Sequence, residues 1–561
     1  MYITQQLHGA KVIFITTSKN EGDYFSTHNP MAMKNLTFAF AFLLSSFAFA
    51  QSTFPFDIVL EPVSITNLPG MQSYAAAQHN GKWLIIGGRI DGLHQRQPWQ
   101  AFNAAGHNIN IYVIDPVAKT YHSAPLSGLS NDTLVAQLSS TNPNFAQVGN
   151  YLYFLGGYGL DASSVHITHP MLTVIDVPST IDDVVQSGTL DSTTFVSFND
   201  EDFAVTGGKL MHLDGSFYLV GGHRFDGQYN PMGHNTFTQA YTEQVLPFTV
   251  SGTFPNMSYS KGTAIIDSNE LHRRDYNVTY MTDGTETYFN AWSGVFQKNQ
   301  TANLPYLNAV EVRDTGIYSV PGFSQYLNHY HCPSVSLYGE NQSAMYTVFF
   351  GGIAQYYYDN GTLTQDNDIP FVKTIGIVEK RNGSYSESYS STEMPGLLGA
   401  GAEFFPTDDL ASTGEIFLAD SLGTDTAWVG HIFGGINSPG ANIFFGGMTN
   451  NSTASPTIFK VGLVRTSGLS VLESNYGENL GLLVSPNPSH GKLIVQIQSV
   501  LQGMTSFEVF DTNGRLVLDT EVPTKAGANT IDLGALQIAS GEYILTATQA
   551  GGRQSINFIW N

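Results

Sequence analysis

"GKWLIIGGR", residues 81–89, is a short apolar run that stops at two adjacent glycines. Similar runs recur as "YLYFLGGYG" (151–159), "SFYLVGGHR" (216–224), "YTVFFGGIA" (346–354) and "NIFFGGMT" (442–449). Each has the length and the β-branched and aromatic composition of a fully buried strand. Because glycine adopts positive φ and lets another backbone approach closely, we expect each pair to end its strand sharply.

The spacing of the glycine pairs is close to regular. Successive second glycines lie 69, 65, 130 and 95 residues apart. Because 130 is twice 65, we expect one further unit between Gly222 and Gly352. The stretch "TETYFNAWSGVF" (285–296) has the strand composition but a degraded glycine pair, near Trp292. The sequence therefore predicts six units, of which the last is stretched by an insertion.

Each unit carries further short strands around its glycine pair. A third strand follows the glycines, as in "NIYVIDPVAKTYHSAPL" (110–126). A repeating period of four short strands predicts an all-β fold, the β-propeller, in which one blade cannot bury its faces alone. The pattern resembles the kelch class of propeller over roughly residues 54–467, although the period is longer than the ~50 residues usual for kelch. We expect "FDIVLEPVSI" (56–65) to complete the last blade beside "PTIFKVGLVRTSG" (456–468), which removes two exposed sheet edges.

The first 50 residues do not share this pattern. "MKNLTFAFAFLLSSFAFA" (33–50) has a basic start, an apolar stretch and an Ala-x-Ala end, which together indicate a signal peptide. A signal peptide does not act from the middle of a chain, so residues 1–32 indicate a mis-assigned start, with translation beginning at Met31 or Met33. The apolar stretch is too short to span a bilayer stably, and we expect no transmembrane segment in the mature chain.

The composition changes again near residue 467. We expect the propeller to occupy 51–467, a linker to follow at 468–479, and a small antiparallel β-sandwich to form from 480–561. Asn513-Gly514 supplies the positive φ that a tight hairpin within this sandwich needs.

The C-terminal segment resembles a known secretion signal. "SPNPSHG" (485–491), "VFDTNGRLV" (509–517) and "IDLGALQIASGEYIL" (531–545) are similar to the C-terminal sorting domain of the type IX secretion pathway of Bacteroidetes. The resemblance implies that the type IX machinery is a partner. It also implies passage across the outer membrane, followed by release or attachment to the cell surface.

Composition narrows the class of partner. Charged residues make up 12% of the chain, against about 25% in an average soluble domain, and the net charge is −23. A chain this negative repels phosphate backbones, so we expect no nucleic-acid partner. The single cysteine, Cys332, excludes an internal disulfide framework, and stability must come from closure of the ring.

The polar residues near the starts of the expected inner strands are candidate ligand contacts. If the six strands converge, they place carboxylates, guanidinium groups, imidazoles and aromatic rings at the mouth of the channel. Such a lining suits a hydroxyl-rich ligand. Structural contacts between blades are the competing explanation. The candidates are Ser73, Asn144, Glu201, Asp202, Arg273, Arg274, Asp275, His329, His331 and Glu403.

These residues also allow two enzymatic alternatives. "HRRDY" (272–276) suits a carboxylated sugar, and some six-bladed kelch propellers are sialic acid mutarotases; Glu201, Asp202 or Glu403 would then be the general acid or base. "NHYHCPSVSLYG" (328–339) holds histidines and Cys332, which a copper radical oxidase of the galactose oxidase type would need. That family has seven blades and further metal ligands, a second tyrosine and a histidine pair, which no motif in this sequence indicates. We therefore expect no metal or other cofactor.

Long loops follow two of the glycine pairs, at 91–108 and 222–237. Both contain Gly-His-Asn, a sequence that readily forms a turn, and both would lie on the same face of the ring. Taken together, the sequence predicts an exported, non-catalytic propeller that binds a glycan or a surface protein at the channel mouth or through these loops. The alternatives are a propeller enzyme acting on a sugar and a structural spacer.

Overall fold

The computed structural model describes residues 54–96, 100–230, 236–298, 304–359, 361–410, 412–413, 415–423, 425–444, 451–466, 482–484, 486–489, 491–499, 502–511, 515–536, 538–549 and 552–561. The expected signal peptide and start lie outside the described residues, as does the expected linker. No helix among the described residues is long and apolar enough to cross a membrane.

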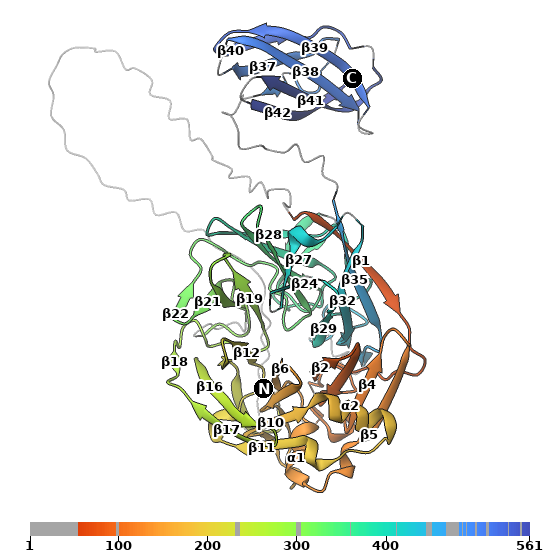
Figure 1. Cartoon of the computed structure of the whole chain (residues 1–561), viewed down its shortest axis with the longest axis vertical. Helices are drawn as coiled ribbons and strands as arrows, with labels where there is room; N and C mark the ends of the chain where they lie inside the picture. The colour runs from red at the N-terminus through yellow and green to blue at the C-terminus, as the bar shows by residue number, and fades with distance from the viewer. Residues whose placement is uncertain are drawn as a thin grey trace, which may run out of the picture. The chain divides into compact units, whose positions relative to one another are not determined.

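Six antiparallel blades surround a common centre, so the sequence prediction of a six-bladed propeller is confirmed (Figure 1). Each blade has four main strands that run outward from the centre in hydrogen-bonded order. The first three blades are β2 (Ala75–His79), β3 (Lys82–Ile86), β4 (Asn110–Asp115) and β5 (Thr120–Pro125); β6 (Asn144–Val148), β7 (Tyr151–Leu155), β10 (Met171–Asp176) and β11 (Phe195–Asn199); and β12 (Lys209–Leu213), β13 (Ser216–Val220), β16 (Gln244–Thr253) and β17 (Asn256–Lys261), with β18 (Ile265–Ile266) also paired to β16.

Blades four to six follow the same plan, with two additions. The innermost strand of blade five gains two more strands on its inner side, and the outer strand of blade six comes from the start of the propeller. These blades are β19 (Asn277–Thr282), β20 (Thr287–Trp292), β21 (Ala309–Arg313) and β22 (Gly316–Ser319); β23 (Ser334–Gly339), β24 (Ala344–Phe350), β27 (Ile375–Arg381) and β28 (Ser384–Tyr389), extended by β31 (Ile416–Leu418) and β30 (Ser412–Thr413); and β29 (Ala402–Pro406), β32 (Ala427–Gly434), β35 (Ile458–Arg465) and β1 (Phe56–Val63).

The second strand of each blade is buried on both faces, which explains its continuous apolar run. In β7, Leu152 and Phe154 pack into a cluster shared with blade one. Tyr153 and Leu155 point the other way, into a cluster shared with blade three. Side chains alternate across a strand, so a strand between two blades needs apolar residues at every position.

The glycine pairs end these strands because neighbouring backbone leaves no room for a Cβ atom. Gly87 and Gly88 have φ of 69° and 80°. A Cβ atom on Gly88 would lie 2.5 Å from the carbonyl oxygen of Gln72. The hidden fourth unit is confirmed as β20, where Ser293 and Gly294 replace the glycine pair and also have positive φ.

The sequence assignment of the sixth glycine pair was wrong. Residues 442–444 of "NIFFGGMT" form a turn rather than a strand, and the rest of that run is not described. The buried strand is β32, which ends at Gly434-Gly435. Both runs are apolar and end in Gly-Gly, so composition alone did not distinguish them.

The ring closes as the sequence predicted. β1 pairs with β35 from Phe56 opposite Arg465 to Val63 opposite Ile458, so that the two ends of the propeller share one sheet (Figure 1). Ile58 of β1 is buried in the core of blades five and six. This pairing covers an edge that blade six would otherwise expose.

Short elements occupy the connections. α1 (Asp132–Leu138) begins at the Asn131 N-cap, and α2 (Val177–Gln186) begins at Asp176 and packs against β4 and β5. Hairpins extend the loops that follow the glycine pairs. They are β8 (Tyr158–Leu160) with β9 (His166–Thr168), β14 (His223–Gly227) with β15 (Phe237–Tyr241), β25 (Tyr356–Asp359) with β26 (Thr362–Gln365), and β33 (Ile436–Asn437) with β34 (Thr453–Ala454).

The C-terminal segment forms a separate antiparallel sandwich with its own core, as predicted. Its core includes Val495, Phe507, Val509 and Leu545. One sheet has the order β36-β37-β40 and the other β39-β38-β41-β42. The strands are β36 (Leu483–Val484), β37 (Ile494–Ser499), β38 (Gly503–Asp511), β39 (Leu516–Thr524), β40 (Gly527–Asp532), β41 (Gly541–Gln549) and β42 (Gly552–Trp560).

Candidate functional site

A nearly complete ring of backbone hydrogen bonds joins the blades where the chain enters the inner strands. Each bond links neighbouring blades, with N···O distances of 2.7–3.2 Å. All members except His331 have positive φ, and His331 forms no such bond to Asp275 among the described residues. In each bond a backbone N–H donates to a backbone carbonyl oxygen. With the donor given first, the pairs are Ser73 to Gly401, Asn142 to Ser73, Gly207 to Asn142, Asp275 to Gly207, and Gly401 to His331.

This ring corrects the alignment of the candidate residues. Ser73, Asp275 and His331 belong to the ring itself. Asn144 and Glu403 lie two residues further along, at the start of the inner strands. Lys209 occupies the corresponding position in blade three. The inner strand of that blade begins at Lys209, whereas the sequence prediction placed its start near Asp202.

A cavity of about 510 Å³ runs along the inner strands of all six blades. It starts beside Lys209 and Glu403 and reaches Asn80 and Gly149, which lie in exposed turns at the other ends of the inner strands. The sequence prediction placed the mouth at the strand starts, whereas this cavity opens at the strand ends. The backbone ring explains the difference, because it narrows the channel at the starts.

Glu403 is the centre of the charged groups in the cavity. Its Oε1 lies 2.7 Å from Nε2 of His331 and 3.9 Å from Nζ of Lys209. Burial raises the pKa of Glu403, but the positive charge of Lys209 and the contact with His331 outweigh burial and lower it below its usual value. Glu403 is therefore ionised at neutral pH.

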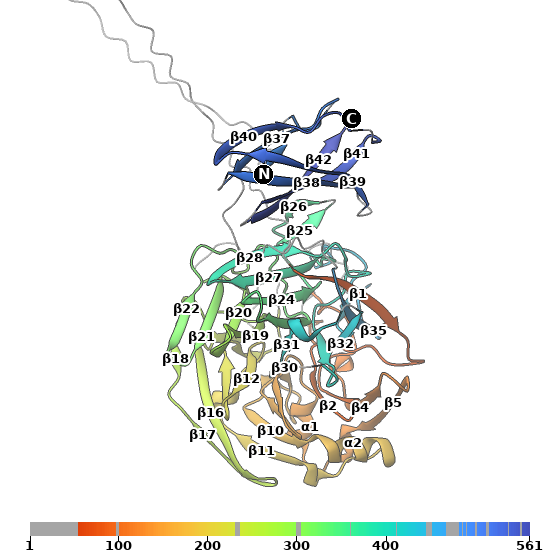
Figure 2. The ribbon, with the colours of Figure 1, turned by 45° about the horizontal axis from the view of Figure 1, so that its top comes forward.

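A second carboxylate enters the cavity from an unexpected element. Glu415 directly precedes β31, which pairs in parallel with β23, from Ser336 opposite Ile416 to Tyr338 opposite Leu418. This pairing places β30 and β31 among the inner strands (Figure 2). Glu415 lines the cavity and is accessible to solvent there, yet the surrounding protein raises its pKa, and Glu403 raises it further against the opposing effect of Lys209.

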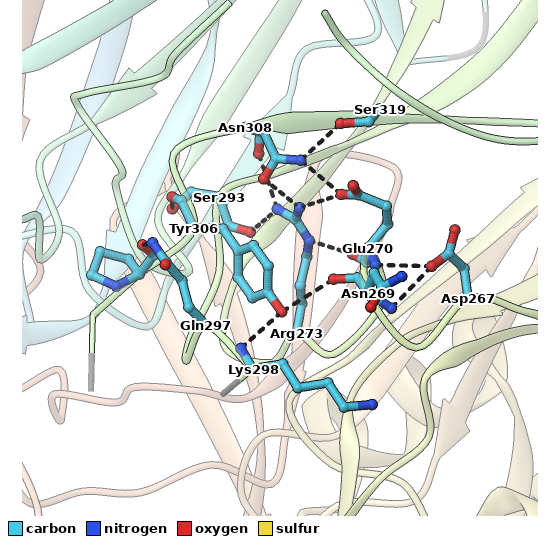
Figure 3. Close-up of polar contacts among 11 residues, drawn as sticks. Asp267, Asn269, Glu270, Arg273, Ser293, Gln297, Lys298, Tyr306, Asn308 and Ser319 are labelled. Carbon is cyan, nitrogen blue, oxygen red and sulfur yellow. Dashed lines mark hydrogen bonds and ion pairs between the residues drawn. The ribbon is translucent and has the colours of Figure 1, made fainter. Parts of the chain in front are cut away.

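Arg273 is buried and does not line the cavity. Surrounding protein groups accept hydrogen bonds from its guanidinium nitrogens (Figure 3). It donates to the backbone oxygens of Glu270, Ser293 and Asn308 and to the side chains of Glu270 and Asn308. Its guanidinium group also lies 4.0 Å from the ring centre of Tyr306. Each N–H group has a partner in the protein, so Arg273 joins the start of blade four to the loop after β20.

Arg274 and Asp275 form an ion pair with each other outside the cavity. Arg274 also donates to the Tyr241 hydroxyl at 3.2 Å and lies 5.2 Å from the ring centre of Phe296. Burial lowers the pKa of Arg274, but Asp275, Tyr241 and Tyr229 together outweigh burial, and the net shift of the pKa is upward. The structure therefore does not leave this arginine pair open to a carboxylated ligand.

Glu201 and Asp202 lie on the exposed outer side of blade three. Glu201 is 2.6 Å from Arg224, and Asp202 is 2.5 Å from Lys261 on the outermost strand β17. Neither lines the cavity. Asp202 and Phe203 lie in a short 3-10 turn that precedes the inner strand β12, so Asp202 is not at the start of that strand.

Asn144 and His329 are buried in structural contacts. The Asn144 amide donates to the backbone oxygen of Val205 at 2.8 Å and so links blade two to blade three. His329 contacts the backbone oxygen of Gly351 through Nδ1 at 2.5 Å, and burial lowers its pKa to about 4. Neither residue lines the cavity.

Cys332 is a core residue at the edge of the cavity. It is 4% exposed, burial raises its pKa to about 12, and its Sγ accepts from the Asn277 amide at 3.5 Å. Within the described part of the chain, no group of three or more His, Cys, Asp or Glu side chains could hold a metal ion.

The long loops after the glycine pairs contact one another. Gln228 donates to the backbone oxygen of Ala101 at 3.0 Å, which joins the loop of blade three to that of blade one. In the first Gly-His-Asn element, Asn108 donates to Gly87 and caps the turn before β4. The second element, 233–235, lies outside the described residues.

Sequence reasoning missed Lys209 and Glu415. "TGGKLMHL" (206–213) resembles "AGAEFFP" (400–406) in placing a charged residue two positions after a glycine, and an alignment on Gly207 and Gly401 would have found Lys209. Glu415 had no such signal, because it belongs to an insertion between β29 and β32 that adds strands to a different blade.

Comparisons with known proteins identify the C-terminal segment. Residues 483–561 match the family model of the secretion system C-terminal sorting domain. The protein is exported. This domain directs secretion or attachment to the cell surface and implies contact with the type IX secretion machinery.

No curated protein matches the chain. A solved structure titled "Structure of YjhT" is similar with a TM-score of 0.38 and 13% identity, covering 71% of this chain and 99% of the other.

Proposed function

We propose that the exported propeller binds a small hydroxyl-rich ligand, a sugar or the end of a glycan, in its central cavity. The observation that carries the proposal is the cavity itself. Its volume of about 510 Å³ falls within the range of roughly 300–1,000 Å³ usual for small-molecule sites, and all six inner strands contribute to it.

The lining of the cavity supports a sugar. Gln78, Lys209 and Ser334 offer donors, and Glu403 offers carboxylate oxygens. Phe404 adds an aromatic surface on which the apolar face of a sugar ring can stack. A few convergent polar groups beside aromatic surface are the usual way to orient a small ligand.

One observation favours a second candidate, general acid–base chemistry on the bound sugar. The pKa of Glu403 is lowered by Lys209 and His331 against burial, while desolvation by the surrounding protein raises the pKa of Glu415. Two carboxylates whose environments separate their pKa values are a common basis for acid and base roles. Incubation of candidate sugars with the protein, followed by NMR spectra of the sugar, tests this candidate; Glu403→Gln and Glu415→Gln should each abolish any turnover.

Binding is tested by filling the cavity. Ser334 lines it on β23, and Ser334→Phe places a bulky ring where the ligand would lie. Ser260 is exposed on β17 at the rim of blade three, so Ser260→Phe is the matched control. We expect a sugar panel to raise the melting temperature of the wild type and of the control but not of Ser334→Phe. A flat panel for the wild type would contradict the proposal.

A further inference from the structure

The charges that line the central cavity are unequal. Its formally charged side chains are Lys209, Glu403, Asp408 and Glu415, one cation against three carboxylates. Both arginines that the sequence suggested for an acidic ligand lie elsewhere and are engaged by protein groups. The cavity therefore offers an acidic ligand one lysine, and that lysine lies beside Glu403.

The carboxylates of the cavity differ in their ion pairing. Lys209 lies 3.9 Å from Glu403, so these two charges largely offset each other. Neither Glu415 nor Asp408 forms an ion pair within the part of the chain that the structure describes. The chain as a whole carries a net charge of −23, which adds a field that favours cations.

Glu415 is the carboxylate that the fold places inside the ring. The parallel pairing of β31 with β23 begins at Ile416 opposite Ser336, and Ser336 itself lines the cavity. Glu415 therefore lies next to a residue that is anchored by strand pairing, whereas Asp408 lies in the bend after β29.

We infer that the cavity selects sugars that carry a free ammonium group over neutral or acidic sugars of the same size, and that Glu415 is the residue that binds the ammonium. This inference rests on the proposed function. An ammonium group has three donors, which carboxylate oxygens accept in short charge-assisted hydrogen bonds. An acidic sugar would instead bring its charge close to Glu403, Glu415 and Asp408.

The electrostatics of the cavity agree with this preference. The surrounding protein and the nearby Glu403 raise the pKa of Glu415, although Lys209 opposes them. A bound ammonium group would add a positive charge beside Glu415 and would favour the ionised form of this carboxylate.

Isothermal titration of the purified protein tests the inference with four probes of one size class. They are D-glucosamine, N-acetyl-D-glucosamine, D-glucose and D-glucuronate. We expect glucosamine to bind about tenfold more tightly than glucose, and glucuronate to bind least. Glu415→Gln keeps the size of the side chain and removes its charge; we expect the preference for glucosamine to fall below about twofold. Glu61→Gln, at an exposed position on β1, is the matched control and should keep the preference.

The outcomes separate the inference from the proposed function. Equal affinity for glucosamine and glucose in the wild type would overturn the inference while leaving sugar binding intact, and so would a preference for glucuronate. A tenfold preference that survives in Glu415→Gln would overturn the role of Glu415. If none of the four sugars binds, both the inference and the proposed function fail.

Discussion

Lys209 and Glu403 face each other across the axis of the propeller, with Nζ of the lysine 3.9 Å from Oε1 of the glutamate. They lie at the starts of β12 and β29, in blades three and six, which are opposite each other in a ring of six. The pair therefore links opposite sides of the ring at the narrow end of the cavity.

Removal of Lys209 should destabilise the protein in a pH-dependent way. The pKa of Glu403 is lowered in the folded state, so its contribution is present above the unfolded value near 4.5 and is lost as the pH falls through the lower folded value. We expect Lys209→Met to cost about 1–3 kcal/mol at pH 7, because it leaves a largely buried carboxylate without its cation, and less at pH 4. Urea unfolding at both pH values measures this.

The matched control for Lys209 is Lys82. Its Nζ also lies 3.9 Å from a carboxylate, that of Asp115, but the side chain is 37% exposed. Lys82→Met should change the stability by less than about 1 kcal/mol at either pH. Equal losses for the two variants would show that the pair across the axis has no special role.

Arg273 should matter for stability and not for ligand binding. Arg273→Met removes the guanidinium donor from the carbonyl oxygens of Ser293 and Asn308, and it leaves the Glu270 carboxylate with the Asn308 amide but without its cation. Breaking such a buried network costs about 3–5 kcal/mol. Arg224, which pairs with Glu201 and Asp226 at an exposed site, is the control, and Arg224→Met should cost less than about 1 kcal/mol. Thermal unfolding compares them; a mild loss for Arg273→Met would contradict its structural role.

Closure of the ring by β1 predicts opposite sensitivities for two adjacent residues. Ile58 is 2% exposed and belongs to the core of blades five and six, whereas Val59 is 37% exposed. Ile58→Ala should destabilise the propeller by about 2–5 kcal/mol through the cavity it leaves. Val59→Ala, on the other face of the strand, should cost less than about 1 kcal/mol. If both variants melt like the wild type, β1 does not hold the ring closed.

Cys332 should be chemically inert in the folded protein. It is the only cysteine of the chain, it is buried, and its pKa is raised to about 12, so almost no thiolate exists at pH 8. We expect a disulfide reagent to label one thiol per chain in denaturant and to react in native buffer at least about a hundredfold more slowly. Rapid labelling of the native protein would indicate an accessible, reactive cysteine and would support the alternative hypothesis of a copper site at Cys332.

The fold could be predicted because its signal is local and repeated. A strand buried on both faces requires an apolar run such as "YLYFL", and the backbone close to Gly88 excludes a side chain there. Both requirements recur in each blade, even where Ser293-Gly294 has replaced the glycine pair. The wrong assignment of residues 442–449 shows the limit of this prediction. Two apolar runs of blade six end in Gly-Gly, and composition does not indicate which of them pairs with β35.

The site could be predicted only in part, because its residues depend on register and on long-range pairing. Asn144 and Glu403 were found, but they were aligned with Ser73 and Asp275, which lie two residues earlier in their blades. A shift of two residues along a strand keeps a side chain on the same face of the sheet. The alternation of polar and apolar residues therefore does not reveal this misalignment. Glu415 depends on a pairing between β31 and β23 that no local pattern specifies.

The most direct test of the central claim is a crystal structure of the protein soaked with the sugar that binds most tightly. The account predicts density for one sugar inside the ring of inner strands, within hydrogen-bond distance of Glu403 or Glu415. Density for the sugar on the long loops or on the outer strands, with only solvent between the six inner strands, would contradict it.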